Sequence, residues 1–241
     1  MTWGRLRHRA TLIYRALIGW RYVVSRDALI IGGLSRPTKL PGWAFGLSPA
    51  NCVTGSRLRS VPGTVCSECY AAKNAYLWKS VTAANRRRDR LLQRALTSPK
   101  ARRRYTTAFA RLLSRIRHPY FRWHDSGDLQ SRDHLALICD IASHTPRVRH
   151  WLPTREYTMV RDYLAAGGAI PENLSVRLSA HLCDQVLPPA AIPTGCTSSG
   201  VFADLATAPG FRCPARSGTP CPDHCRACWD RGVPLVTYPL N

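Results

Sequence analysis

Acidic residues are scarce in the first half of the chain. Residues 1–120 contain only three of the 14 Asp and Glu residues, against 24 of the 35 Lys and Arg residues. Residues 121–241 hold 11 of each sign, so the whole net charge of +21 belongs to the first half. Such a surface favours nucleic acid or another polyanion as a partner. A generally basic surface without a specific partner is the simpler alternative.

A long apolar run is also missing. The most apolar stretch near the start, residues 11–24, is interrupted by Arg15 and Arg21, and no convincing cleavage site follows it. The pattern does not match a secretory signal or a membrane span. We therefore expect a cytoplasmic protein without a membrane partner. In a reducing compartment its ten cysteines are better interpreted as metal or cluster ligands than as disulfides.

Length and composition predict one α/β domain. The chain has 241 residues, of which 45% are hydrophobic and 20% charged, enough for a real core without a signal of disorder. Residues 1–34 are basic and lack a clear periodicity, so we interpret them as an extension. Residues 35–241 form the predicted domain, with a Cys-rich tail at about 205–230.

One stretch has the pattern of a strand, a turn and a helix. Residues 120–123 are aromatic-rich and predict a strand, and Ser126-Gly127 is a turn dipeptide. Ser131 is placed to cap the helix that follows. The residues between strand and helix lie where βα folds carry their chemistry. Three are candidate catalytic residues, although an Asx-rich turn before a capped helix would also explain them: His124, Asp125 and Asp128.

The strand pattern recurs along the chain. Residues 148–152 and 174–178 predict further strands, a short helix is expected over 157–166, and 233–238 predicts a last strand. Strand starts about 26–28 residues apart, each strand ending in polar residues, indicate either a partial or irregular barrel-like (βα) parallel sheet or an open parallel sheet, with one functional edge. The predicted cofactor-binding residues at this edge are Ser126, Gly127, Asp128, Thr154, Arg155, Arg177 and Ser179.

Four cysteines near the C-terminus have metal-ligand spacing. They follow the pattern C-x7-C-x3-C-x2-C within sixteen residues, among several prolines: Cys213, Cys221, Cys225 and Cys228. Four thiolates can hold zinc or a [4Fe–4S] cluster, and spacing does not separate the two. Free thiols in a loop are the alternative.

Three further cysteines form a second group. Cys52, Cys66 and Cys69 are spaced C-x13-C-x2-C. Three thiolates leave a metal site open, as in catalytic centres. A fourth ligand could instead come from elsewhere in the sequence, from His124, Cys183 or Cys196. Cys139 falls on the apolar stripe of its helix and is most simply a core residue.

Two arginine triplets lie on expected helices. The first follows Cys69 in an Ala- and Arg-rich segment that runs to about Leu96, and the second is on a helix that Ser98 caps, over about 98–116. They are candidates for a phosphate-binding face, with a solvated face as the alternative. The residues are Arg86, Arg87, Arg88, Arg102, Arg103 and Arg104.

Several of these motifs, in this order, resemble the phage "gene product 88" family, found in phages and mobile elements. The resemblance covers about residues 35–241. It rests on Trp43-Ala44-Phe45 with Cys52, Cys66-x-x-Cys69-Tyr70-Ala71, Phe121-Arg122-Trp123-His124 with Ser126-Gly127-Asp128, Thr154-Arg155, Leu174–Ala180, and Cys225-x-x-Cys228-Trp229.

A more remote similarity points to radical S-adenosylmethionine enzymes. Those enzymes hold a [4Fe–4S] cluster by three cysteines, and a Gly-Gly-Glu turn after the second strand meets the amino group of the cofactor. Here Ser126-Gly127-Asp128 stands in the corresponding place. The usual C-x3-C-x2-C motif is absent, so the similarity is one of analogy.

Three hypotheses follow. The first is an iron–sulfur enzyme of this radical type acting on a nucleic acid or its precursor, with S-adenosylmethionine as cofactor and with an auxiliary cluster or zinc in the tail. The second is a non-enzymatic, zinc-stabilised nucleic-acid-binding protein. The third, metal-assisted hydrolysis with His124, Asp125 and Asp128 as ligands, is weaker, because such sites usually draw on several strands.

Overall fold

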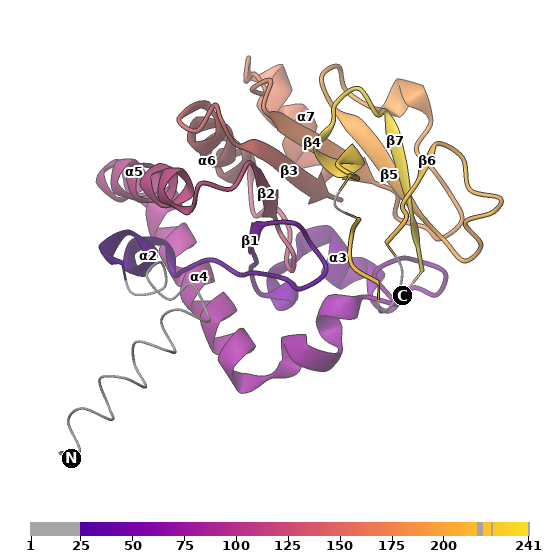
Figure 1. Cartoon of the computed structure of the whole chain (residues 1–241), viewed down its shortest axis with the longest axis horizontal. Coiled ribbons are helices and arrows are strands. Elements are labelled where there is room, and N and C mark those ends of the chain that lie inside the picture. Colours follow the sequence, from indigo (N-terminus) through magenta and orange to yellow (C-terminus); the bar gives the residue numbers. More distant parts are fainter. Residues whose placement is uncertain (1–24, 216–218, 223, 241) are drawn as a thin grey trace.

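The computed structural model describes residues 25–215, 219–222 and 224–240. A seven-stranded sheet, in which neighbouring strands are all parallel, has the order β1-β2-β3-β4-β5-β7-β6 (Figure 1). The α/β class and the parallel sheet are therefore confirmed, whereas residues 1–24 of the expected extension lie outside the described residues. The strands are β1 (Trp43–Phe45), β2 (Tyr120–Trp123), β3 (Arg149–Thr154), β4 (Leu174–Ser179), β5 (Thr197–Phe202), β6 (Phe211–Arg212) and β7 (Leu235–Pro239).

Six α-helices are present among the described residues. They are α2 (Arg26–Ile31), α3 (Val53–Leu58), α4 (Lys79–Thr97), α5 (Pro99–Ile116), α6 (Arg132–Ser143) and α7 (Tyr157–Ala165). Short 3-10 turns are η1 (Pro49–Asn51), η2 (Tyr70–Ala72), η3 (Asn74–Leu77), η4 (Pro189–Ala191) and η5 (Ala227–Trp229). In the described part of the chain no helix has the length and apolar character needed to cross a membrane.

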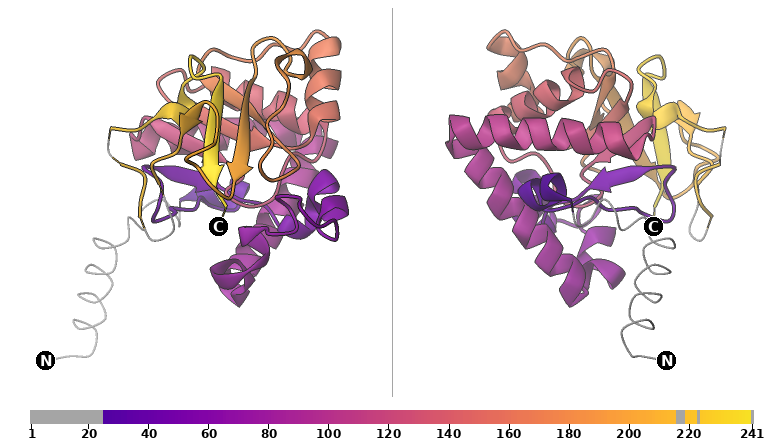
Figure 2. Two further views of the ribbon diagram at one scale, coloured as in Figure 1. Left: turned by 90° about the vertical axis from the view of Figure 1, so that its right-hand side faces the viewer. Right: turned by 60° about the vertical axis from the view of Figure 1, so that its left-hand side comes forward.

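The strand order places the helices on one face of the sheet. From β1 to β5 the order follows the sequence, and right-handed crossovers then bring each connecting helix to the same side, as in a barrel. Phe109 of α5 packs edge-on against Phe45 and Phe121, with ring centroids 5.3 and 5.7 Å apart. Figure 2 shows α5 lying along the outside of the sheet. The sheet stays open, with β1 and β6 at its two edges.

The opposite face, which we call the inner face, is covered by the C-terminal part of the chain. Side chains alternate along a strand, so Tyr120 and Arg122 point away from the helix-facing Phe121. Trp229 of η5 packs on Tyr120, with ring centroids 5.4 Å apart, and its indole N–H donates to the carbonyl of Phe121 at 2.9 Å. Cys225, Cys228 and Trp229 of the Cys-rich tail thus pack with Trp151 in a second, smaller buried cluster on this face.

Two predictions of local structure differ from the observed elements. The helix expected after Cys66 begins only at Lys79, because the preceding segment is tied down by tertiary contacts: the hydroxyls of Tyr70 and Tyr76 donate to the carbonyl of Asp125 at 2.8 and 3.2 Å. Strand β5 was not expected, since its Thr-Ser-Ser-Gly sequence has no apolar pattern. It is nevertheless buried between β4 and β7.

Candidate functional site

The carboxyl ends of β2 and β3 are joined by Asp128. Its Oδ1 accepts from the hydroxyl of Thr154 at 2.6 Å and from the amide of Leu129 at 2.7 Å, and its Oδ2 accepts from the amide of Arg155 at 2.9 Å. The turn needs Gly127, whose φ is 77°, because a Cβ there would lie 2.7 Å from Leu47. The predicted meeting of Asp128, Thr154 and Arg155 at one edge therefore occurs.

Burial sets the charge state of this edge. Burial raises the pKa of Asp128 to about 6. The three hydrogen bonds to its carboxylate act in the opposite direction and lower this pKa, whereas the charge of Glu156 raises it. Glu156 is also buried and accepts from the amide and the hydroxyl of Thr54 at 2.8 and 2.7 Å, which ties β3 to α3. Two buried carboxyl groups are thus in electrostatic range of each other, and our sequence reasoning missed Glu156. The signal for Glu156 was its place in the polar sequence that ends β3.

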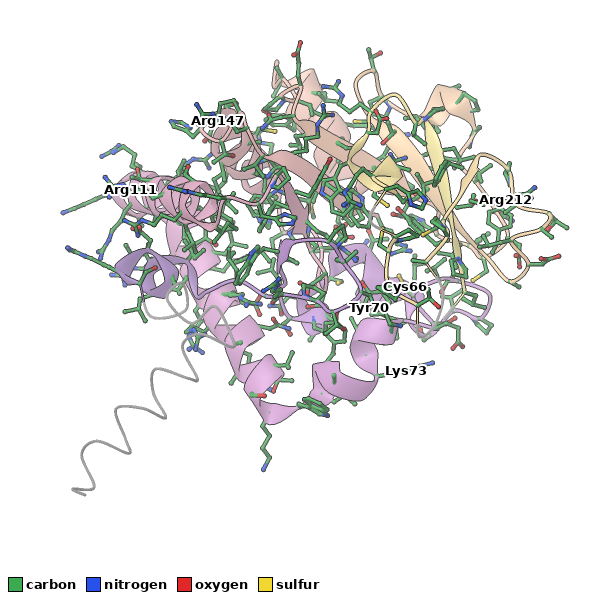
Figure 3. The ribbon with its side chains drawn as sticks, viewed as in Figure 1. Cys66, Tyr70, Lys73, Arg111, Arg147 and Arg212 are labelled. Carbon is green, nitrogen blue, oxygen red and sulfur yellow. The ribbon has the colours of Figure 1, made fainter. Side chains whose placement is uncertain are left out.

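The N-terminal cysteine group, Cys52, Cys66 and Cys69, lies next to these acids. Burial raises the pKa of Cys52 to about 12, and Asp128, the other two thiols and Glu156 add to this shift. A side chain on Gly55 would begin 3.5 Å from Cys66 Sγ and 3.7 Å from Cys52 Sγ, so glycine keeps the space between these sulfurs open. Figure 3 shows Cys66 below the sheet, near Tyr70.

The spacing of these thiols bears on what they can hold. No group of three or more His, Cys, Asp and Glu side chains in the described ranges is arranged to hold a single metal ion. Zinc bonds of about 2.3 Å require sulfurs about 3.8 Å apart. A [4Fe–4S] cluster accepts more widely spaced sulfurs, because each thiolate binds a different iron. Assignment of these thiols to a cluster or to zinc stays a prediction.

The C-terminal cysteine group, Cys213, Cys221, Cys225 and Cys228, is brought together on the inner face. Burial raises the pKa of Cys221 and of Cys228 to about 11 each, and electrostatic repulsion among the four thiols contributes. Cys228 Sγ lies 3.3 Å from the hydroxyl of Tyr238. Among the described residues these four thiols, too, are not arranged as a group that could hold a single metal ion. The metal assignment itself stays a prediction.

His124 and Asp125 occupy a strained and buried strand end. His124 has a φ of 53°, a costly backbone conformation for a bulky residue, and burial lowers its pKa well below the usual range. Within the described residues neither ring nitrogen of His124 has a hydrogen-bond partner, nor does Asp125 Oδ1. The ring of His124 faces the ring of His134 at 5.2 Å, and these residues do not form a metal group with Asp128.

Three other predicted cofactor residues have structural contacts. The guanidinium of Arg177 is fully buried and donates to four backbone carbonyls, including those of Ala227 and Asp230 beside the C-terminal cysteine group. The hydroxyl of Ser126 donates to the carbonyl of Leu47 at 2.8 Å, and that of Ser179 accepts from Ser199 at 3.0 Å. Their assignment to a cofactor stays a prediction.

Arg122 was not among our candidate residues. It lies on the inner face with its guanidinium 4.5 Å from the ring centroid of Trp151, and it donates to the hydroxyl of Tyr70 at 2.9 Å. The signal was an arginine on a strand between two large aromatic residues, in a parallel sheet whose strands are buried on both faces. Arg122 is the side chain that extends from the C-terminal cysteine group towards the loop carrying Cys69.

The arginine triplets divide between surface and core. Arg88 is buried and donates to the carbonyls of Gly33 and Gly46, so it does not belong to the basic surface, and Arg102 pairs with Asp140 at 2.6 Å. The exposed members are Arg86, Arg87, Arg103 and Arg104. Three consecutive helical residues point in different directions, which explains the division.

The remaining cysteines are separate from both groups. All ten cysteines are free. Cys139 is buried in the helix-side core as expected, and Cys196 lies near it, away from the N-terminal cysteine group. Cys183 is in a loop whose amide donates to the carbonyl of Gly63 at 2.9 Å, just ahead of Cys66. Of the three alternative fourth ligands, Cys183 is thus on the segment paired with the cysteine loop.

Comparison with known proteins gives a family. Neither the curated proteins nor the solved structures contain a match to this chain. The model of the gene product 88 family matches residues 24–231, which include both cysteine groups, the Asp128 turn and all seven strands except β7. The chain therefore belongs to the gene product 88 family.

Proposed function

We propose that this protein is an iron–sulfur enzyme of the radical S-adenosylmethionine type, with its cluster on the N-terminal cysteine group. The observation that carries the proposal is positional. The three cysteines lie in the loop after β1, the Ser126–Asp128 turn follows β2, and both are at the carboxyl edge of a sheet whose first five strands follow sequence order. Cys52 and Cys66 are each in electrostatic range of Asp128.

The acids near Cys52 favour a cationic ligand on that side of the site, whereas Arg155 and Arg59 are nearer to Cys66. Asp128 and Glu156 are buried beside Cys52, and Asp128 uses only three of the roughly four acceptor positions of a carboxylate. S-adenosylmethionine carries a sulfonium and an amino group, both positive. A cluster with one iron free of cysteine, when bound, supplies the electron for reductive cleavage of that cofactor. Asp128 and Glu156 would position the cationic groups.

The basic first half supports a nucleic acid or nucleotide as substrate. It holds the net charge of +21, and the exposed arginines lie on α4 and α5, the helices that follow the cysteine loop. Phosphate contacts supply affinity without sequence information. The C-terminal cysteine group would hold an auxiliary cluster or zinc.

Anaerobic reconstitution tests this proposal. We expect protein loaded with iron and sulfide to show the broad visible absorption of an iron–sulfur cluster. It should also bind S-adenosylmethionine in calorimetry. Asp128→Asn should keep the iron and lose the cofactor. Wild-type protein that carries a cluster but does not bind S-adenosylmethionine would contradict the radical-type assignment.

One observation favours a second function, a zinc-stabilised nucleic-acid-binding protein. The C-terminal cysteine group is packed into the core on the inner face, as a structural zinc site would be. Metal analysis distinguishes the two functions. Zinc without iron or sulfide after anaerobic purification would support the binding protein, and iron with sulfide would support the enzyme.

A further inference from the structure

Two guanidinium groups lie on the inner face beside the C-terminal cysteine group. Arg177 of β4 is 0% exposed and donates to the carbonyls of Ala227 and Asp230 at 3.1 and 3.2 Å, on either side of Cys228. The guanidinium carbon of Arg122 of β2 lies over the ring of Trp151, 4.5 Å from its centroid, and Trp151 packs in one cluster with Cys225 and Cys228. Both guanidiniums are in electrostatic range of the Cys228 thiol.

These positive charges are only partly balanced by the described residues: Tyr70 and Asp125 help to raise the pKa of Arg122 against the effect of burial. Neither arginine has an ion pair within the described ranges. Asp125 is in electrostatic range of Arg122, but it also faces the buried Arg88. Burying a guanidinium without a counter-charge is strongly unfavourable, so a group of opposite charge is expected nearby.

Unused hydrogen-bond donors occur at the same place. In the described part of the chain, the Nε atoms of Arg122 and Arg177 and the indole nitrogen of Trp151 are buried without a partner. Arg122 is the direct neighbour of Trp151 across β2 and β3. Buried N–H groups without acceptors cost free energy, so an acceptor is also expected. Thiolate and sulfide sulfurs are acceptors, and donors to them tune metal centres.

A loaded four-cysteine centre supplies both the charge and the acceptors. Four thiolates around Zn²⁺, or around a cluster core of charge 2+, leave a net charge of about −2. We propose that Arg122 and Arg177 are the built-in counter-charges of a dianionic centre held by the C-terminal cysteine group. This inference rests on the C-terminal centre of the proposed function and adds the residues that neutralise it.

The test compares loaded and metal-free protein. Full-length Cys66→Ser protein leaves the C-terminal cysteine group as the metal site to be measured, and Arg122→Met or Arg122→Lys is added to it. Met keeps the bulk without charge, and Lys restores the charge. We expect Arg122→Met to lose its metal at a chelator concentration at least about tenfold lower, and Arg122→Lys to remain within about threefold.

In the metal-free proteins, Arg122→Met should not be at a disadvantage in thermal stability. Without the dianion the buried guanidinium is only partly compensated, so chelated Arg122→Met should melt at or above the temperature of its chelated parent. Should Arg122→Met not fold, Trp151→Phe, which removes one donor and keeps the packing, should weaken metal retention by a few-fold. Absence of metal from the Cys66→Ser protein would overturn the centre itself. Metal retention that is equal in the Met variant and the parent would overturn the counter-charge role alone.

Discussion

The two cysteine groups of this protein lie in different electrostatic surroundings. The N-terminal group has a mixed environment, because Asp128 and Glu156 disfavour thiolate at Cys52, whereas Arg155 and Arg59 favour thiolate at Cys66. The C-terminal group is beside Arg122 and Arg177, which favour thiolate at Cys228. The cysteine sulfurs of the two groups therefore differ in how their surroundings affect ionisation. In the proposed function, the acids near Cys52 would receive a cationic ligand at an open site, and the arginines near Cys228 would neutralise a closed centre of four thiolates.

The largest expected effect is loss of the closed centre. Cys225→Ser should lower soluble yield and metal content together, because metal ligation cross-links a loop that covers the inner face, and structural metal binding contributes folding free energy directly. Cys196→Ser, a half-buried thiol outside both groups, is the matched control. Unchanged metal stoichiometry in Cys225→Ser would contradict metal binding by the C-terminal cysteine group.

Loss of the open centre should leave the fold intact. Cys66→Ser should remove iron from the N-terminal group and abolish S-adenosylmethionine binding, while the metal of the C-terminal group and the melting temperature stay close to wild type. Metal analysis and calorimetry on one preparation check this. Cys183→Ser tests the alternative fourth ligand, and a loss of iron equal to that of Cys66→Ser would show that the site is closed by four thiols.

The acid beside the open centre should be visible in the pH dependence of stability. The pKa of Asp128 is raised to about 6 in the folded protein, so its stabilising contribution is present below its usual pKa and is lost as the pH rises through 6. Relative to Asp128→Asn, wild type should gain about 1.4 kcal/mol of unfolding free energy between pH 7.5 and pH 5. Urea unfolding of both proteins at the two pH values measures this. A difference that does not vary with pH would mean that the carboxyl group titrates normally.

The smallest effect concerns the basic surface on the side of the open centre. Each phosphate contact contributes about 0.9 to the slope of log affinity against log salt concentration for duplex DNA, so Arg86→Ala with Arg103→Ala should reduce that slope by about 1.8. The double variant Arg147→Ala with Arg149→Ala removes the same charge from exposed residues beyond the first half and should leave the slope unchanged. Equal reductions in both variants would show that only net charge matters.

Much of the sheet could be predicted from local sequence. Strand β2 is observed at the predicted residues, and β3, β4 and β7 are within one or two residues of the expected bounds. Their aromatic and branched side chains alternate or run between turn residues, which is a local signal. Strand β5 could not be predicted in this way, because Thr197, Ser198 and Ser199 are held by their neighbours in the sheet and not by an apolar pattern.

The sequence by itself determined which chemical groups the protein has: seven cysteines with ligand spacing, polar strand ends, and a first half with almost no acids. Only the tertiary structure decided their surroundings. It placed Glu156 against α3, turned Arg88 into the core, and brought Arg122 and Arg177 to Cys228 from two different strands. Spacing along the chain limits which residues are able to meet within a loop, whereas burial and the charges of distant strands set how those residues ionise, and these appear only when the sheet has formed.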